Sequence, residues 1–240
     1  MVNRDSSPQP SPLTAPLAAL AVLFLLLWLA PAWASMPLRA LATVVHEMAH
    51  GLSALATGGR FVRFVLYPDG SGLAYTQGGW QALVTAAGYL GVACFAALLL
   101  VLGGGRRSSR WTLGILSGAI LLLGLRYGFP TLLAGELGPG LWTLGSCLGM
   151  GGVGLAVALR GGPLALSFTL DLAAFYCAVT AFNDLWVLYR LPGEQASDAQ
   201  NMARLTGLPP SFWAVAWALM AVVVTVVGMR LAWSLRSSGR

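Results

Sequence analysis

Residues 79–103 read GWQALVTAAGYLGVACFAALLLVLG and contain no charged side chain. An α-helix needs about 20 predominantly apolar residues to cross the hydrocarbon core of a bilayer, so this stretch is long enough and apolar enough to span one. Comparable stretches occur along the rest of the chain, at Leu13 to Ala34, Leu38 to Thr57, Trp111 to Phe129, Pro139 to Arg160, Leu164 to Arg190 and Ser211 to Leu235. The sequence therefore predicts about seven hydrophobic helices.

The composition of the whole chain agrees with this pattern. Of the 240 residues, 57% are hydrophobic and 9% are charged, whereas soluble domains contain about 25% charged residues. The mean hydropathy is +0.75, which excludes a water-soluble domain. The net charge of +6 comes from arginines that flank apolar runs, where lipid headgroups lie, so we expect no nucleic-acid partner. We predict an all-α, multi-pass integral membrane protein whose surroundings are the lipid bilayer.

The predicted domain organisation is simple. Residues 1–12 are rich in Ser and Pro and are expected to form a disordered tail. Residues 13–236 are expected to form a single membrane-embedded domain. The apolar run from Leu17 to Ala30 ends in Ala32-Trp33-Ala34, which fits a signal-peptide cleavage site, but its length favours a retained helix.

A short β-hairpin is predicted directly after the second apolar segment. Arg60 to Tyr67 is rich in Phe and Val, Pro68-Asp69-Gly70 is a turn signal, and Leu73 to Gln77 can return as the partner strand. Open strand edges cannot face lipid, so the hairpin should lie at the interface or in a protein-lined cavity. It is either a surface turn between two helices or an edge that binds a peptide substrate by strand addition.

The second apolar segment carries the motif His46-Glu47-Met48-Ala49-His50, or HExxH, and its two histidines are the only ones in the chain. At helical spacing, residues i and i+4 project from one face, so both imidazoles can bind one metal ion. Imidazole nitrogen and carboxylate oxygen suit Zn²⁺, and Glu47 lies where a general base is needed. The motif predicts a zinc site that hydrolyses peptide bonds.

A catalytic zinc site takes a third protein ligand, which must here be a carboxylate from another segment. Asp171 and Asp184 lie within an apolar span, where an ionisable group is costly unless it has a function. Asp198 belongs to Ser197-Asp198-Ala199-Gln200, which fits the capping box of a short helix, and we favour that role over a ligand. Asp184, Asp171 and Asp198 remain open as the third ligand.

Four blocks carry a resemblance to a known family: HEMAHGLSALATGGRF at 46–61, AAGYLG at 86–91, AFNDLW at 181–186 and SDAQNMARLTGLPPSFWAVAW at 197–217. The chain resembles the site-2-protease-like integral membrane zinc metallopeptidases. The resemblance implies that His46, His50 and Asp184 bind Zn²⁺ and that Glu47 activates water. It further implies a zinc metalloendopeptidase that cuts membrane-embedded or membrane-proximal substrates. Asn183, which is next to Asp184, either binds the substrate or makes a hydrogen bond between helices.

Other readings remain. Membrane HExxH proteases of the prenyl-protein or heat-shock type use a glutamate as third ligand, but only Glu136 and Glu194 are available, both in predicted loops. A non-proteolytic metal-binding scaffold or a transporter is the alternative function, because ionisable residues in a membrane also mark ion routes. The expected partner is a membrane protein or peptide substrate, a regulatory partner is left open, and the expected location is a bacterial cell membrane.

Overall fold

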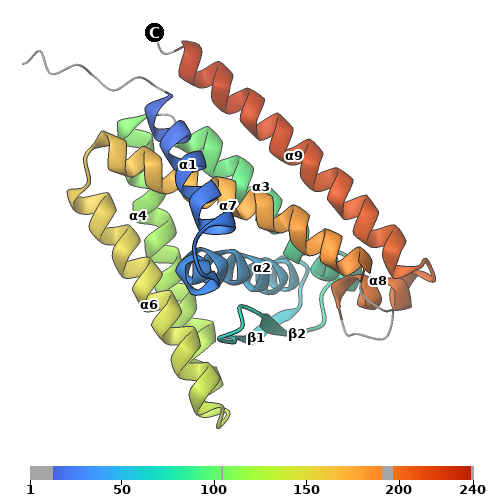
Figure 1. The fold of residues 1–240 in the computed structure, drawn as a ribbon. Coiled ribbons are helices and arrows are strands. Elements are labelled where there is room, and N and C mark those ends of the chain that lie inside the picture. The colour runs from blue at the N-terminus through green and yellow to red at the C-terminus, as the bar shows by residue number, and fades with distance from the viewer. Residues whose placement is uncertain (1–12, 104, 191–196, 239–240) are drawn as a thin grey trace, which may run out of the picture.

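The computed structural model describes residues 13–103, 105–190 and 197–238, and within these only the backbone of residues 106, 183–190, 236 and 238. The described chain is mostly helical and contains one two-stranded antiparallel sheet, as the sequence predicts (Figure 1). The predicted tail at residues 1–12 lies outside the described residues. In chain order the elements are α1 (Thr14–Trp28), the 3₁₀ turn η1 (Ala32–Ser35), α2 (Met36–Ala56), β1 (Arg60–Leu66), β2 (Gly72–Gln77), α3 (Gln81–Leu102), α4 (Arg106–Leu123), the π-helical turn η2 (Gly124–Gly128), α5 (Phe129–Leu133), α6 (Leu137–Arg160), α7 (Pro163–Arg190), α8 (Asp198–Thr206) and α9 (Pro210–Ser238).

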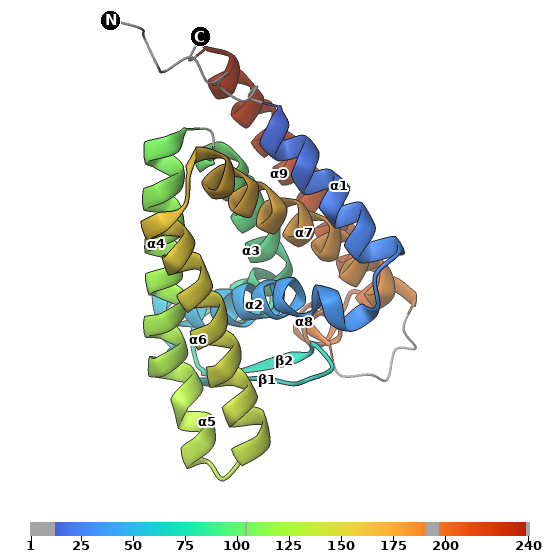
Figure 2. The ribbon, with the colours of Figure 1, turned by 60° about the vertical axis from the view of Figure 1, so that its left-hand side comes forward.

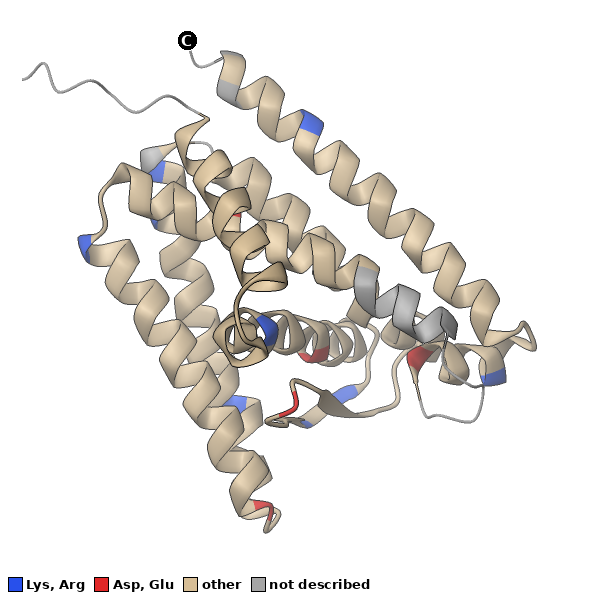
Figure 3. Cartoon of the chain, in the orientation of Figure 1, with Lys and Arg blue, Asp and Glu red and all other residues tan. Residues whose placement is uncertain are grey.

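Five helical segments have the length and the apolar composition of membrane spans, which supports an integral membrane protein. Charged residues are sparse along them (Figure 3). These segments are Gln81–Leu102, Arg107–Leu133, Leu137–Arg160, Pro163–Phe182 and Pro210–Leu235.

The prediction of seven crossing helices is not confirmed, because the first two apolar segments differ from the rest. α1 has 15 residues, or about 22 Å at 1.5 Å per residue, which is shorter than the ~30 Å hydrocarbon core. It ends just before Pro31, which has no backbone N–H and so cannot continue the helix. α2 is long enough, but it carries Arg39, Glu47 and two histidines.

α2 is the central element of the fold. It lies across the longer helices, with the paired α4 and α6 on one side and α3, α7 and α9 on the other (Figures 1 and 2). The hairpin runs along α2 and contacts it through both strands (Figure 2). Because α2 contacts α3, α6, α7 and both strands, its side chains are held from several directions.

The hairpin is confirmed close to its predicted bounds. β1 pairs with β2 from Arg60↔Gln77 to Leu66↔Gly72, with a bulge between Phe61 and Arg63. The turn closes with a hydrogen bond from the Tyr67 N–H to the Ser71 carbonyl, 2.9 Å. Its Gly70 has φ +87°, a conformation that glycine adopts without a Cβ clash.

The outer edge of β1 is closed by helix hydroxyls. The Leu66 N–H donates to Thr143 Oγ1 of α6 at 2.8 Å, and the Thr131 hydroxyl of α5 donates to the Phe64 carbonyl at 2.8 Å. Both threonines are fully buried. Because a buried backbone group without a partner is costly, these hydroxyls let a strand edge lie inside a helical protein. A salt bridge of 2.7 Å between Arg63 and Glu136 also ties β1 to the residue before α6.

Candidate metal centre

The two histidines of the HExxH motif point to the same place. His46 and His50 lie one turn apart on α2, and their Nε2 atoms are 3.0 Å from each other. Their rings meet edge to face with centroids 4.7 Å apart. The geometry is the one expected from i, i+4 spacing on a helix.

Asp198 is the carboxylate that lies at this histidine pair among the described residues. Its Oδ2 is 3.1 Å from His46 Nε2 and 3.2 Å from His50 Nε2. The predicted helix start is also present, because the Ser197 side chain accepts a hydrogen bond from the Gln200 N–H. Asp198 is therefore the first residue of α8 and also a neighbour of both imidazoles, whereas the sequence had favoured the first role alone.

Electrostatics keep the Asp198 carboxyl ionised. Burial raises the pKa of this carboxyl, but its hydrogen bonds to the His46 and His50 imidazoles outweigh burial and hold the pKa below its ordinary value. An ionised carboxylate beside two imidazoles is a suitable ligand set for a divalent cation.

The distances within the group fit zinc. His46, His50 and Asp198 each offer one ligand atom, and these atoms lie 3.0 to 3.2 Å apart. A tetrahedral site with zinc–ligand distances of about 2.0–2.1 Å has ligand–ligand distances of about 3.3 Å. The three atoms thus already have nearly the spacing of one face of a zinc tetrahedron, and the fourth position is left for water or substrate.

α3 approaches the imidazoles where it has a glycine. A Cβ built on Gly88 would lie 2.4 Å from His46 Nε2 and 2.5 Å from His50 Nε2. Any side chain at position 88 would therefore occupy the space between α3 and the metal-binding nitrogens. The absence of a side chain at position 88 allows α3 to come this close to the histidines. The sequence alone did not indicate this role.

Each of the two imidazole rings makes a further contact that fixes its orientation. His50 Nδ1 lies 2.6 Å from the Val84 carbonyl. A carbonyl only accepts hydrogen bonds, so Nδ1 donates to it, and Nε2, which faces His46 and Asp198, is the atom that would bind a metal ion. The Tyr89 ring meets His46 edge to face at 4.7 Å, and it stacks in turn on Trp217 of α9 at 5.7 Å.

Glu47 lies beside the two histidines but outside the group formed by His46, His50 and Asp198. Its side chain is 5% exposed and accepts a hydrogen bond from the Ala74 N–H of β2. A Cβ on Gly72 would come within 2.9 Å of Glu47, so the hairpin packs directly on this carboxylate. Glu47 is thereby held in place apart from the three side chains that could hold a metal ion.

A cleft of about 710 Å³ opens at the site. His46 and Glu47 line it together with Arg39 and Thr43, which are further residues of α2. Residues 70–72 of the hairpin form another wall, and Trp28 of α1 and Thr180 of α7 lie on the opposite side. A peptide in this cleft would have access to both the metal ligands and Glu47.

Among the other candidate residues, the structure describes the side chains of Asp171 and Glu136 but not those of Asp184, Asn183 and Glu194. Asp171 is fully buried in α7, but it is not part of the group around the histidines. Glu136 is engaged by Arg63. The side chains of Asp184 and Asn183 lie outside the described residues, as does Glu194. The predicted ligation by Asp184 and substrate contact by Asn183 therefore stay predictions.

Several residues of the site were not assigned from the sequence. Gly88 and Tyr89 lie in the AAGYLG block, which carried the resemblance but no stated role. Arg39 and Thr43 precede His46 on α2 by seven and three positions, so helical spacing could have placed them on the same side. The Val84 carbonyl has no sequence signal, because any residue can supply one.

Comparison with known proteins supports the resemblance. The family model for Peptidase M50B-like proteins matches residues 17–228. Comparisons with curated proteins and with solved structures found no match. The matched region includes α2 with its histidine pair, the hairpin and α8 with Asp198. Because this family model matches most of the sequence, the chain belongs to the Peptidase M50B-like family.

Proposed function

We propose that the protein is an intramembrane zinc metalloprotease of the site-2-protease type, which hydrolyses peptide bonds of membrane-embedded or membrane-proximal substrates. A bacterial cell membrane is its proposed location. The observation that carries the proposal is the convergence of His46, His50 and Asp198 within 4.8 Å, with the separate carboxylate of Glu47 beside them. Membership in a peptidase family supports the same conclusion.

The roles follow from the positions of the side chains. His46, His50 and Asp198 are the proposed zinc ligands, with Asp184 as the alternative third ligand. Zinc bound there would supply a Lewis acid that polarises the scissile carbonyl and acidifies water. Glu47 takes up the proton as water attacks, since it lies next to the ligands without being one. The Ala74 N–H fixes the carboxylate for this transfer.

The cleft walls suggest how a peptide lies at the site. The Ser71 carbonyl points toward β1, so the backbone groups of Gly72 and Ala74 point to the free edge of β2 by strand alternation. The Ala74 N–H is used by Glu47, whereas Gly72 lines the cleft. The substrate backbone can therefore pair with the hairpin at Gly72. Asn183 of α7 is proposed as a further substrate contact.

Substitution of the base tests the proposal. Glu47→Gln should keep zinc and lower the rate of peptide cleavage by about 10²-fold or more, because only the proton acceptor is removed. Glu136→Gln is the matched control, since Glu136 pairs with Arg63 away from the metal centre. Cleavage of single-span peptides in vesicles, followed by mass spectrometry, is the measurement. Equal rates for Glu47→Gln and wild type would contradict the mechanism.

The alternative of a metal transporter or scaffold makes a different prediction. Zinc uptake into proteoliposomes, independent of Glu47 and without hydrolysis of any peptide, would favour it. Such a protein has no need for a buried carboxylate that is held beside the metal ligands but outside the ligand set, and Glu47 is one.

A further inference from the structure

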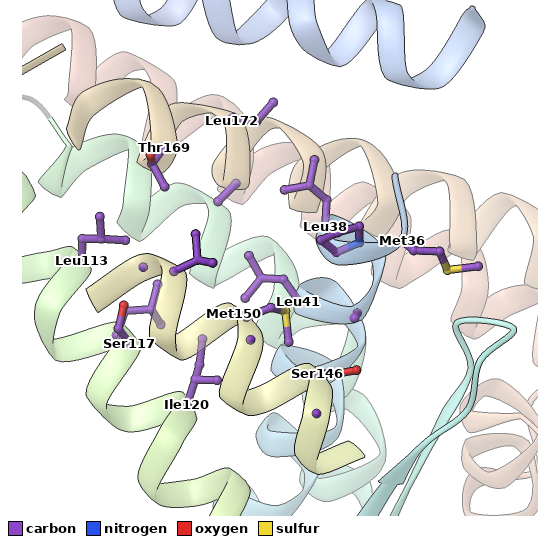
Figure 4. A pocket seen from close by; sticks show the side chains of 18 of the residues that line it. Met36, Leu38, Leu41, Leu113, Ser117, Ile120, Ser146, Met150, Thr169 and Leu172 are labelled. Carbon is purple, nitrogen blue, oxygen red and sulfur yellow. The ribbon is translucent and has the colours of Figure 1, made fainter. Parts of the chain in front are cut away.

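The first turns of α2 face two cavities of different character. Met36, Leu38 and Leu41 line a cavity of about 610 Å³ that is bounded by α2, α4, α6 and α7, and no charged side chain occurs among the described residues that line it (Figure 4). Arg39 and Thr43 line the catalytic cleft instead. The start of α2 thus presents apolar side chains to one cavity and its arginine to the cleft that contains the metal centre.

Arg39 lies on the same face of α2 as the proposed ligand His46. The two residues are seven positions apart, which is close to two full turns and about 10 Å along the helix axis. Beside Glu47, Arg39 is the charged side chain among the described residues that line the cleft, if His46 is counted as neutral. A peptide whose scissile carbonyl lies at the metal centre can therefore extend along the cleft as far as Arg39.

The hairpin turn holds the Arg39 side chain in the cleft wall. A Cβ built on Gly70 would overlap the Nε and Cδ atoms of Arg39, so the arginine side chain packs on the bare Cα of this glycine. The Gly70 carbonyl also accepts a hydrogen bond of 2.8 Å from the Thr43 hydroxyl, which lies one turn after Arg39 on α2. The turn and the first turns of α2 are therefore fixed to each other, and Arg39 has a defined place between them.

The charge of Arg39 is not neutralised by a neighbouring acid. Within the part of the chain that the structure describes, no acidic side chain forms an ion pair with its guanidinium. Asp69 of the hairpin turn accepts hydrogen bonds from the Ser71 N–H at 2.9 Å and the Ser71 hydroxyl at 2.7 Å. These bonds lower the pKa of the Asp69 carboxyl, and Arg39 adds a smaller part.

The position of Arg39 in its own helix is unfavourable as well. Arg39 lies in the first turn of α2, where the positive end of the helix dipole disfavours a cation. Neither an ion pair nor the helix therefore accounts for an arginine at this place. A negatively charged group in the cleft would account for it.

We propose that Arg39 is a specificity-determining residue that binds a carboxylate of the substrate about three residues from the scissile bond. The inference rests on the proposed protease function and narrows its substrate class. An arginine fork pairs with a carboxylate through two parallel hydrogen bonds. An extended chain advances about 3.3 Å per residue, so three residues bridge the distance along α2 from His46 to Arg39. The carboxylate is an Asp or Glu side chain or the carboxyl terminus of the substrate.

A set of paired peptides measures this preference. Each pair has the same apolar background and carries either Glu or Gln at one position, and the position differs from pair to pair. In phosphatidylcholine vesicles, the wild type should cut the Glu peptide with about tenfold higher kcat/KM when this residue is about three positions from the cut bond, because Gln cannot form the charge-assisted pair. The gain should lie in KM at equal kcat, since Arg39 does not touch the reacting atoms. Mass spectrometry of the products gives the cut bond and the rates.

Substitutions at position 39 should change this preference according to charge. Arg39→Gln should abolish it, Arg39→Lys should keep part of it, and Arg39→Glu should reverse it in favour of a peptide with Lys at the same position. Arg60→Gln is the matched control, because Arg60 is an exposed arginine at the open end of the hairpin, paired with Gln77, and does not line the cleft. It should keep the wild-type preference. Equal Glu-to-Gln ratios in wild type and Arg39→Gln, or equal losses in Arg39→Gln and Arg60→Gln, would overturn the proposal.

Further probes separate the possible sources of the negative charge. One peptide ends about three residues beyond the cut bond with a free carboxyl terminus, and its partner ends there with an amide. An Arg39-dependent gain from either the Glu side chain or the free terminus supports the proposal and identifies the source, whereas no gain from either overturns it. Phosphatidylglycerol tests a lipid phosphate as the anion. If it raised the rates of Glu and Gln peptides alike through Arg39, without a Glu preference in phosphatidylcholine, Arg39 would bind lipid and the proposal would be wrong.

Binding to the Glu47→Gln protein separates this inference from the proposed function. A fluorescent Glu peptide should bind with a Kd about tenfold lower than its Gln partner, and adding Arg39→Gln should remove the difference. Hydrolysis by the wild type without a preference for a carboxylate would reject the role of Arg39 and leave the protease. Arg39-dependent binding of the Glu peptide without any hydrolysis by the wild type would reject the protease and leave a cleft that binds carboxylates.

Discussion

Asp198 and His46 are 152 residues apart in the sequence, yet Oδ2 of the first lies 3.1 Å from Nε2 of the second. The packing of α8 brings them together. Ala199 and Met202, which follow Asp198, are buried in a cluster with Ala93 of α3 and Trp217 of α9. The metal centre therefore depends on the contact of α8 with α3 and α9 as much as on the HExxH helix.

The close approach of α3 to the imidazoles predicts that Gly88→Ala disrupts the metal site. The new methyl group would lie within about 2.5 Å of both Nε2 atoms, so at least one imidazole must move. We expect zinc affinity to fall by about 10-fold to 100-fold, as when metal-site orientation is lost. Competition with a chromogenic chelator measures this affinity.

Gly91→Ala is the control for a general loosening of α3 from α2, because its Cβ would meet Ala49 rather than an imidazole. It should lower thermal stability and retain more zinc than Gly88→Ala. If Gly88→Ala kept the zinc affinity of the wild type, the small size of residue 88 would not be needed for zinc binding, which contradicts the prediction.

Removal of the metal should destabilise the protein. Binding to the folded state alone contributes about 4 kcal/mol when free zinc exceeds Kd by about 1,000-fold. The chelator 1,10-phenanthroline should therefore lower the Tm in detergent, and added zinc should restore it. His46→Ala serves as control, since the chelator should leave its Tm unchanged. A wild-type Tm that ignores the chelator would argue against a zinc site.

The Thr143 hydroxyl at the edge of β1 should stabilise the fold without taking part in the metal site. Thr143→Val keeps the shape but leaves the Leu66 N–H without its acceptor. An unsatisfied buried group costs about 1–3 kcal/mol, so the free energy of unfolding should fall by that amount. Thr112→Val, at a partly exposed position of α4, should change it little. Thermal unfolding of both variants decides the matter, and equal Tm values would mean that the strand edge needs no cap.

Local patterns in the sequence predicted the parts of this structure that are themselves local. The HExxH spacing fixes both imidazoles on one helix face, and Pro68-Asp69-Gly70 marks the hairpin turn, so both were predicted. The position of Asp198 beside the histidines was not, because its capping-box pattern is fully explained by the start of α8. Only packing with α3 and α9 carries that carboxylate to the histidines.

The predicted number of spans is not confirmed for a similar reason. Apolar composition at residues 13–34 does not reveal that α1 ends at Trp28, and hydropathy does not show that α2 lies across the other helices. The packing of the glycine pairs could not be predicted either. The Gly145/Gly149 spacing looks the same in sequence as Gly124/Gly128, and only the tertiary structure shows that one pair is packed and the other open.

Zinc stoichiometry of purified Asp198→Ala and Asp184→Ala, each compared with wild type, tests the central claim most directly. The expected result is about one zinc per chain in wild type and in Asp184→Ala, and a loss of most of it in Asp198→Ala, because a catalytic site takes three protein ligands. Full zinc in Asp198→Ala together with loss in Asp184→Ala would contradict the ligand set proposed from the structure.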